Sequence, residues 1–529
     1  MEQRQIPRLE RYGDKIQLMV DGRPFIMLAG EVHNSSASSL EYMESIWKKA
    51  ESWHLNTLIL PISWELLEPE EGAFDFTLTD GLLAQAREHA MKLVLLWFGS
   101  WKNTSSSYVP AWVKTQPDRF WRAQAHTGHD YVEFGGHRMM ALSPLCQEAR
   151  DCDRRAFCAL MSHLKEVDEE RTVLAIQVEN EVGILGAARD HHPKAEEAFA
   201  AAVDSGLTDY LDSHLERLQP QLRRAYLGGS RRGSWREVFG SEADEVFMAW
   251  QYGSYIGEIA RAGREIYPLP MAVNAWLVQY EGEQPGSYPS GGPVSRMADV
   301  WRAAAPDVEI HAPDIYLRTF CQVCDQYAVE DNPLFIPEVK SDRTSLAGVY
   351  YAIGEHKAIC FAPFGVEDMD RPNDQPIPAV AAEDTLEFER SGLAGPFAEN
   401  YRLLGGMLPL LQQHYPLNGT MRGFYQQGLG GELFSFPDYD VRIHYNQPEW
   451  EPAGGLVIAL GPDEFLFAGF GYQATIHSKA SEDSLVDFLS IDEGEYENGN
   501  WRQGRRLNGD ELAVQLVKPC IRRVKVYRY

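Results

Sequence analysis

Two glutamates follow directly after an apolar stretch about one third of the way along the chain. Residues 176–183 read IQVENEVG, so Glu179 and Glu181 come just after the run from Val173 to Ile176. A strand that simply ends in water would show this change from apolar to acidic residues. The alternative is a strand that delivers a carboxyl group to a catalytic site, and the rest of the chain must distinguish the two.

A further glutamate, Glu338, ends the short apolar run PLFIPE at residues 333–338. Cleavage of a glycosidic bond requires two carboxyl groups at one pocket. One stays protonated and donates its proton to the leaving oxygen, while the other stays ionised and attacks or stabilises the sugar cation. Glu181 and Glu338 could form such a pair if their strands belong to one sheet.

Eight short apolar runs, separated by longer amphipathic segments, could form that sheet. Such alternation is typical of βα units, and eight parallel strands close a barrel whose active site lies at the carboxyl ends of the strands. This arrangement would place Glu181 at the end of the fourth strand and Glu338 at the end of the seventh. The runs span residues 24–34, 56–64, 92–101, 171–181, 270–276, 309–316, 333–338 and 358–365.

The sequence pattern changes near residue 416, where alternating β-rich runs separated by Gly, Pro, Asn and Asp begin. We therefore predict an α/β fold in which a (β/α)8 TIM barrel over residues 1–415 is followed by a small antiparallel β-sandwich domain over residues 416–529. A hairpin around Asp21 and Gly22 precedes the barrel strands, and residues 184–265 form a long, helix-rich insertion.

The first two predicted βα units resemble those of the glycoside hydrolase family 35 β-galactosidases, which are retaining enzymes of clan A. The similarity covers roughly residues 10–400, and the segment FGSWKNTSSSYVPAW at residues 98–112 is similar to a divergent bacterial branch with a C-terminal domain. The QVENEVG segment and Glu338 fit the same family. The matching positions in the first two units are Gly30, His33, Trp47, Trp64, Glu68, Pro69, Gly72, Phe74 and Phe76.

The resemblance implies a role for each residue at the strand ends. Glu181 would be the general acid/base, and Glu338 the nucleophile. Asn180 would hydrogen-bond the sugar 2-hydroxyl, a contact that strengthens in the transition state. Tyr316 would keep the nucleophile ionised through its phenol, or else be an aromatic residue of the rim. Glu179 is expected to point to the face opposite Glu181 and to act structurally.

The chain departs from the family at positions that contact galactose hydroxyls. Pro61 stands where the family has a Tyr, and Trp101, Lys102 and Asn103 stand where it has Cys-Ala-Glu. Galactose is therefore favoured by the resemblance and unsupported at these residues. Trp101 and Asn103 remain candidate sugar contacts that could set substrate choice.

Other polar and aromatic side chains at the strand ends could also bind sugar. Glu31, His33 and Glu65 are candidate ligands for sugar hydroxyls, because every buried hydroxyl needs a partner. Their alternative role is in ion pairs of the barrel rim. Trp97, Trp101 and Trp276 could stack on the apolar face of a sugar, or could equally be core residues.

These observations predict a retaining exo-acting β-glycosidase, with β-galactosidase favoured, that hydrolyses terminal β-linked sugars of an oligosaccharide substrate. The alternatives are a β-glucosidase or transglycosylase acting on β-gluco-oligosaccharides and a non-catalytic carbohydrate-binding barrel. The chemistry needs no cofactor and no metal. We therefore interpret the Cys321-x-x-Cys324 segment as ordinary thiols. The same holds for five histidines, which we interpret as ordinary imidazoles: His126, His129, His137, His191 and His192.

Composition limits the partners and the location. The net charge of -28 on 529 residues disfavours nucleic acid and anionic membrane surfaces. Seven scattered cysteines do not resemble a disulfide framework, and the N-terminal residues lack the apolar core of a signal peptide. We expect a cytoplasmic protein, and the sequence leaves open a homo-oligomer.

Overall fold

The central sheet is a closed barrel of eight strands in the order β10-β11-β12-β13-β4-β5-β6-β9. The computed structural model describes residues 4–13, 15–126, 128–129, 132–134, 136–280, 282–370, 392–449, 451–480 and 484–529. Each of the eight predicted runs coincides with one barrel strand, with β6 and β12 each extending one residue beyond its run, which confirms the predicted (β/α)8 barrel. The strands are β4 (Met27–Glu31), β5 (Thr57–Ser63), β6 (Lys92–Lys102), β9 (Val173–Asn180), β10 (Met271–Trp276), β11 (Ile310–Ile315), β12 (Phe335–Val339) and β13 (Cys360–Pro363).

Two compact units share these strands: residues 1–8, 34–44 and 59–317 form one, and residues 9–33, 45–58 and 318–529 form the other. In the first unit, β9 pairs in parallel with β6 on one side and with β10 on the other, and β10 pairs with β11. Nearly every residue of these strands is buried, which explains why each reads as a continuous apolar run.

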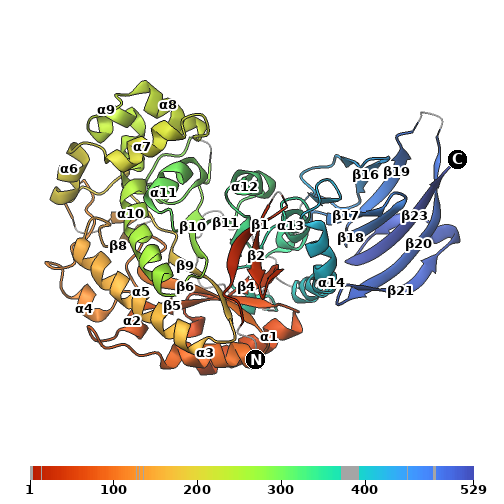
Figure 1. Ribbon diagram of the computed structural model, residues 1–529, viewed down its shortest axis with the longest axis horizontal. Coiled ribbons are helices and arrows are strands. Elements are labelled where there is room, and N and C mark those ends of the chain that lie inside the picture. Colours follow the sequence, from red (N-terminus) through yellow and green to blue (C-terminus); the bar gives the residue numbers. More distant parts are fainter. Residues whose placement is uncertain are drawn as a thin grey trace. The chain divides into compact units, whose positions relative to one another are not determined.

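Helices of the first unit follow the strands as the βα pattern predicts. In α5 (Gln147–Val167) the buried positions recur every three or four residues, so one face packs inward. The predicted insertion after β9 contains α6, α7, α8, α9 and all of α10 except its last residue, and Figure 1 shows α6 to α9 grouped beside α10 and α11 in yellow and green. The other helices are α2 (Trp64–Leu67), α3 (Thr77–Glu88), α4 (Ala111–Lys114), α6 (Pro193–Ala200), α7 (Ser205–Ser213), α8 (Pro220–Gly228), α9 (Trp235–Phe239), α10 (Ala243–Ile266) and α11 (Ala298–Ala304), with α1 (Leu40–Ser52) following β4.

The second unit contains β12, β13 and β4, which pair in that order. The predicted N-terminal hairpin is present, because β2 (Lys15–Val20) and β3 (Arg23–Pro24) pair antiparallel around Asp21-Gly22, with β1 (Arg8–Tyr12) completing a three-stranded sheet. Its helices are α12 (Phe320–Tyr327), α13 (Arg343–Gly354) and α14 (Ala394–His414).

The C-terminal strands, drawn in blue in Figure 1, form two antiparallel sheets around one apolar core, as predicted. Phe424, Val457 and Phe467 from one sheet pack with Val441 and Ile443 from the other. The six-stranded sheet contains β14 (Met421–Tyr425), β17 (Gly454–Gly461), β18 (Glu464–Phe470), β23 (Cys520–Arg528), β20 (Val486–Glu497) and β21 (Asn500–Leu507), and the four-stranded sheet contains β15 (Glu432–Ser435), β16 (Tyr439–Tyr445), β19 (Tyr472–Ser478) and β22 (Val514–Leu516).

Helix α13 and strand β14 approach each other at two glycines. A Cβ added to Gly354 would lie 2.7 Å from the Cα of Gly423, so only glycine fits there. Next to this contact, Arg422 forms two 2.8 Å hydrogen bonds with Glu355.

The domain boundary at residue 415 remains a prediction, although it lies between the end of α14 at His414 and the start of β14 at Met421. None of the helices within the described ranges is long and apolar enough to cross a membrane.

Candidate active site

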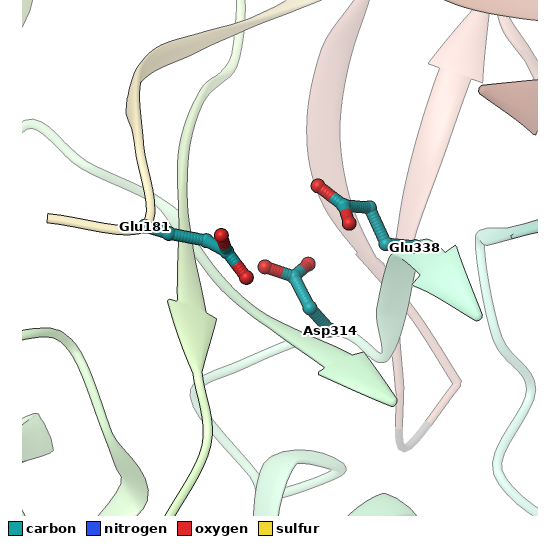
Figure 2. A group of neighbouring side chains, drawn as sticks. All are labelled: Glu181, Asp314 and Glu338. Atoms are coloured by element: carbon teal, nitrogen blue, oxygen red, sulfur yellow. The ribbon is translucent and has the colours of Figure 1, made fainter. Parts of the chain in front are cut away.

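Three buried carboxyl groups meet at the ends of barrel strands. Glu181 directly follows β9, Asp314 lies in β11 and Glu338 lies in β12. One oxygen from each lies within 4.8 Å of the others, and Figure 2 shows the three side chains directed toward one another. Their exposed fractions are 7%, 3% and 3%, so little water screens the charges that they carry.

The backbone at the end of β9 is bent, and the bend separates the two glutamates of IQVENEVG. Both Glu179 and Glu181 have φ in the left-handed region, at 64° and 45°, where residues other than glycine are uncommon. In a regular strand, residues two apart share a face. The bend instead directs Glu179 to β6 and α5, whereas Glu181 turns to Asp314 and Glu338.

Asn274 on β10 joins Glu181 to Asp314. The backbone N–H of Glu181 donates a 2.8 Å hydrogen bond to Asn274 Oδ1, and Asn274 Nδ2 donates a 2.7 Å hydrogen bond to Asp314 Oδ2. The sequence analysis missed both Asn274 and Asp314. Asp314 could have been found, because it precedes Tyr316 by two residues in HAPDIY and strand alternation puts both on one face.

Asn180 is held from the neighbouring strand. Lys102 and Asn180 are paired in the register of β6 and β9, and Lys102 Nζ donates a 2.7 Å hydrogen bond to Asn180 Oδ1. Both side chains are buried. Lys102, which the sequence analysis noted only as a departure from the expected family, therefore fixes the orientation of the Asn180 amide.

The two other candidates near the end of β6 have different surroundings. Trp101 is 1% exposed, and its indole N–H donates to the carbonyl oxygen of Leu142 at 3.0 Å. Its ring packs edge-on against Tyr252 and Tyr255, which is a core environment. Asn103 lies in the turn after β6, where its φ is 48°.

The remaining candidates occupy separate positions. His33 Nε2 lies 2.8 Å from Asp368 Oδ2, and Glu65, with its side chain 36% exposed, forms a 3.0 Å ion pair with Lys114. The Glu65–Lys114 contact is an ion pair of the kind considered as the alternative to sugar binding, whereas the His33–Asp368 contact is a hydrogen bond that becomes an ion pair when the imidazole is protonated. Glu31 is fully buried at the end of β4, Tyr316 directly follows β11, and Trp276 ends β10 with its ring edge-on to Phe134 at 6.3 Å.

The carboxyl cluster also offers the oxygen donors that a hard divalent cation such as Mg²⁺ or Ca²⁺ prefers. Cys321 and Cys324 are free thiols buried on α12, and burial raises the pKa of both above the ordinary value, so they stay protonated. His191 stacks on His126 and hydrogen-bonds Glu196 at 2.6 Å. Cys321 and Cys324 are therefore buried packing residues, and His191 packs on a neighbouring ring and is held by a hydrogen bond.

Comparison with protein families corrects the expected family. Residues 37–228 match the model of the glycoside hydrolase family 42 β-galactosidases, and residues 397–516 match a domain of unknown function, DUF5597. The expectation of family 35 was wrong, because strand-end glutamates on a barrel are common to clan A and do not separate its families. The family 42 match includes Asn180 and Glu181, and Glu338 lies beyond it.

Individual relatives are similar over part of their length. A β-galactosidase of Xanthomonas manihotis is 27% identical over 179 residues, which are 33% of this chain and 26% of that protein. The structure of a β-galactosidase from Bacillus circulans sp. alkalophilus has a TM-score of 0.46 and 13% identity, covering 72% of this chain and 56% of that one. A β-galactosidase from the haloarchaeon Halorubrum lacusprofundi has a TM-score of 0.41 and 16% identity, covering 64% and 52%.

This chain thus spans about a quarter of the curated relative and about half of these two solved proteins. The family model and the barrel agree on the class of domain. Over residues 37–228, the chain is similar to the glycoside hydrolase family 42 β-galactosidases.

Proposed function

We propose that this protein is a retaining exo-acting β-glycosidase that hydrolyses terminal β-linked sugars, with β-galactosides as the favoured substrates. The observation that carries the proposal is the meeting of Glu181 and Glu338 at the strand ends, with carboxyl oxygens within 4.8 Å. A retaining enzyme needs carboxyl groups about 5 to 5.5 Å apart, whereas an inverting enzyme leaves about 6.5 to 9.5 Å for a water molecule. The close spacing therefore favours retention.

In the first step, Glu338 attacks the anomeric carbon while Glu181 donates its proton to the glycosidic oxygen, which leaves with the aglycone. In the second step, Glu181 removes a proton from water, and the water oxygen displaces Glu338 from the glycosyl-enzyme ester. Glu181 regains its proton and Glu338 its negative charge. The third carboxylate, Asp314, favours the protonated state of Glu181, because it adds negative charge beside it.

Asn180 is proposed to contact the sugar next to the scissile bond. Since Lys102 occupies its Oδ1, the Asn180 amide nitrogen is the group that can donate to the 2-hydroxyl. Hydrogen bonds to this hydroxyl strengthen in the transition state and are worth several kcal/mol. Tyr316, Glu31, His33, Glu65, Trp101, Asn103 and Trp276 remain proposed sugar contacts, of which Trp101 and Glu65 have the least support from their packing.

Azide rescue tests the two catalytic roles. Glu338→Gly should abolish turnover of aryl β-galactosides, and azide should restore it with formation of the α-glycosyl azide. Glu181→Ala should still cleave activated leaving groups, and azide should give the β-glycosyl azide, because it then attacks the glycosyl-enzyme. Glu216→Ala, at a glutamate whose side chain is 80% exposed, serves as the control and should behave as wild type. The reverse pattern of anomers would refute the assignment.

A substrate screen distinguishes the alternative functions. Aryl β-galactoside, β-glucoside, β-fucoside and β-xyloside, followed by natural disaccharides, would identify a β-glucosidase, and sugar transfer to added acceptors would identify a transglycosylase. Sugar binding without turnover of any of the four would indicate a carbohydrate-binding barrel. Dialysis against EDTA should leave turnover intact, because two carboxyl groups suffice for the mechanism; loss that Mg²⁺ or Ca²⁺ restores would assign the carboxyl cluster to a metal.

We further propose that the protein works in a reducing compartment such as the cytoplasm, since its seven cysteines are all free thiols. Its oligomeric state can be measured by light scattering.

A further inference from the structure

A second carboxyl pair lies outside the catalytic cluster, where β6 and β9 meet helix α5. Asp153 of α5 and Glu179 of β9 are 0% and 1% exposed. The two carboxyl groups share one donor, because the backbone N–H of Ser100 lies 2.9 Å from Glu179 Oε1 and 3.1 Å from Asp153 Oδ2. Two buried carboxyl groups this close together favour holding one proton between them, since two adjacent negative charges would repel each other without screening by water. Neither residue belongs to the proposed catalytic machinery, yet Glu179 directly precedes Asn180 and Glu181.

The pair fills a gap in the strand ladder. In the register of β6 and β9, Trp97 is opposite Val178 and Lys102 is opposite Asn180, so residues 98–101 all lie opposite Glu179 alone. Within this bulge, the Glu179 carboxyl group accepts hydrogen bonds from the backbone N–H groups of Ser100 at 2.9 Å and of Trp101 at 2.6 Å. Glu179 thus ties the end of β9 to the bulge of β6.

The bulge has no room for a side chain at its centre. A Cβ added to Gly99 would lie 2.4 Å from Trp97 Nε1, 2.6 Å from Glu179 Oε1 and 2.7 Å from Asp153 Oδ1. The carboxyl pair, the indole and the backbone of β6 therefore form one packed unit, and a small separation of the two carboxyl groups would displace the strand ends.

The hydrogen-bond donors indicate which residue holds the proton. Asp153 accepts from Trp97 Nε1 at 2.8 Å, Ser100 Oγ at 2.7 Å and Ser100 N at 3.1 Å. Within the described part of the chain, the Glu179 carboxyl group accepts hydrogen bonds from two donors, the backbone N–H groups of Ser100 and Trp101. More donors stabilise the ionised form, so Asp153 carries the negative charge and Glu179 the proton. Consistent with this, burial and then the charge of Asp153 raise the pKa of Glu179 well above its ordinary value.

The other ionisable groups around the pair do not neutralise a second negative charge. Tyr255 of α10 shares the Ser100 hydroxyl at 2.7 Å, and burial raises the pKa of its phenol well above the ordinary range. Cys146 precedes α5, and burial raises the pKa of its thiol. Lys102 at the end of β6 directs its ammonium group to Asn180, and Glu181 after β9 would add negative charge.

We propose that Glu179 and Asp153 form a proton-dependent latch that positions Asn180 and Glu181 by holding the ends of β6 and β9 together. With one shared proton, the pair closes the bulge. When hydroxide removes the proton from Glu179, two adjacent buried carboxylates repel each other and the strand ends separate. The positioning role rests on the proposed function of Asn180 and Glu181, whereas the protonation of Glu179 does not.

Two amide substitutions distinguish the location of the proton. In Glu179→Gln, the amide N–H can replace the acid proton toward Asp153, its oxygen can accept from Trp101 N, and Asp153 still accepts from Ser100 N. In Asp153→Asn, the new amide NH2 group would lie against the N–H or O–H donors of Trp97 or Ser100, where no acceptor is present. The proton of Glu179 would also lose the carboxylate that accepts it. We therefore expect Glu179→Gln to fold and unfold like wild type at neutral pH and Asp153→Asn to be strongly destabilised.

Infrared spectroscopy and thermal unfolding test the latch without substrate. In the Glu181→Gln, Glu245→Gln background, which removes the other two acid protons that we expect at neutral pH, the carbonyl stretch of a buried carboxylic acid should persist and should disappear when Glu179→Gln is added. The melting temperature should fall as the pH rises above the ordinary glutamate value, because the fold binds a proton that the unfolded chain releases, and Glu179→Gln should reduce this fall. The proposal would be overturned if the infrared band of the buried carboxylic acid were absent. It would also be overturned if Asp153→Asn folded normally while Glu179→Gln did not fold.

Turnover measurements then test positioning. With the aryl glycoside that the wild type cleaves best, Glu179→Gln should keep kcat/KM within about threefold at neutral pH and extend activity to higher pH, while Asp153→Asn should lose about tenfold or more even where it is folded. An unchanged alkaline limb in Glu179→Gln would refute the latch as a positioning device. If no glycoside is cleaved by wild type, the infrared and unfolding results still decide the protonation of the pair, so the two failures are distinguishable.

Discussion

The backbone N–H of Glu181 and the side-chain oxygen of Asn274 are joined by a 2.8 Å hydrogen bond across β9 and β10. Through its Nδ2, the same Asn274 amide also binds Asp314. A single amide therefore places the proposed acid/base relative to the third carboxylate, and it does so from a strand that contributes no carboxyl group itself.

Replacing Asn274 should impair turnover more than folding. Asn274→Ala removes both hydrogen bonds, and a buried group left without its partner costs about 1 to 3 kcal/mol, so kcat/KM should fall by about tenfold or more. Asn274→Asp should be worse, because it places a carboxylate against Asp314. Steady-state kinetics and thermal unfolding measure the two effects. Asn332→Ala is the matched control, since this buried asparagine donates a 2.8 Å hydrogen bond to the carbonyl oxygen of Tyr327 at the end of α12, and its replacement should lower stability with little change in kcat/KM.

Lys102→Met should weaken the use of the sugar 2-hydroxyl. The methionine keeps most of the apolar stem but removes the donor to Asn180 Oδ1, so the amide can rotate. The wild type should cleave an aryl β-galactoside much faster than its 2-deoxy analogue, and the variant should discriminate less between them. An undiminished ratio in the variant would show that Lys102 does not orient Asn180 toward the substrate.

Asn103 should tolerate glycine better than larger residues. Its φ of 48° lies in the left-handed region, where glycine is unstrained and alanine is disfavoured. We expect Asn103→Gly to keep the melting temperature and Asn103→Ala to lower it. If the Asn103 side chain contacts sugar, both variants should change the ratio of kcat/KM between β-galactoside and β-glucoside by the same factor, about 5-fold or more. An unchanged ratio would place Asn103 away from the sugar.

Glu245 should make stability depend on pH between about 4.5 and 7. Burial raises the pKa of this carboxyl group from 4.5 to about 7, although Arg296 lies 2.7 Å from it and opposes the shift. Since the folded state binds the proton more tightly, its contribution is full below pH 4.5 and is lost as the pH rises through about 7, by up to about 3 kcal/mol. Glu245→Gln should flatten this part of the unfolding-temperature curve. A curve as steep as that of the wild type would assign the dependence to other groups.

Cys321 and Cys324 should be dispensable for turnover. Both are buried, so alanine is the better replacement, because a serine hydroxyl would be buried in their place. The double variant Cys321→Ala, Cys324→Ala should keep kcat/KM and lose a few degrees of melting temperature. Loss of turnover with an intact circular dichroism spectrum would revive a redox or metal role for the CxxC segment.

The sequence alone determined the barrel and two residues of the proposed site. Strands buried on both faces must read as apolar runs, so β9 and β12 were visible locally, and so were the acids at their ends, Glu181 and Glu338. The C-terminal sheets were predictable for the same reason, from alternation along each strand. The family could not be predicted in this way, because the motifs used for it are shared by related barrels. Signs of the difference were Pro61, residues 101–103, and Ile336-Pro337 before Glu338, where family 35 has Asn-Ser.

The tertiary structure decided which side chains accompany the two glutamates. Asn274 lies 93 residues from Glu181 in the chain, and Lys102 lies 78 residues from Asn180; each pair meets only through strand register. The separation of Glu179 from Glu181 depends on two left-handed φ angles and on a bulge in β6, which neither residue encodes by itself. Local residue patterns specify strands and helices, whereas the contacts of polar side chains depend on how those strands are paired, and so the site could be only partly predicted from the sequence.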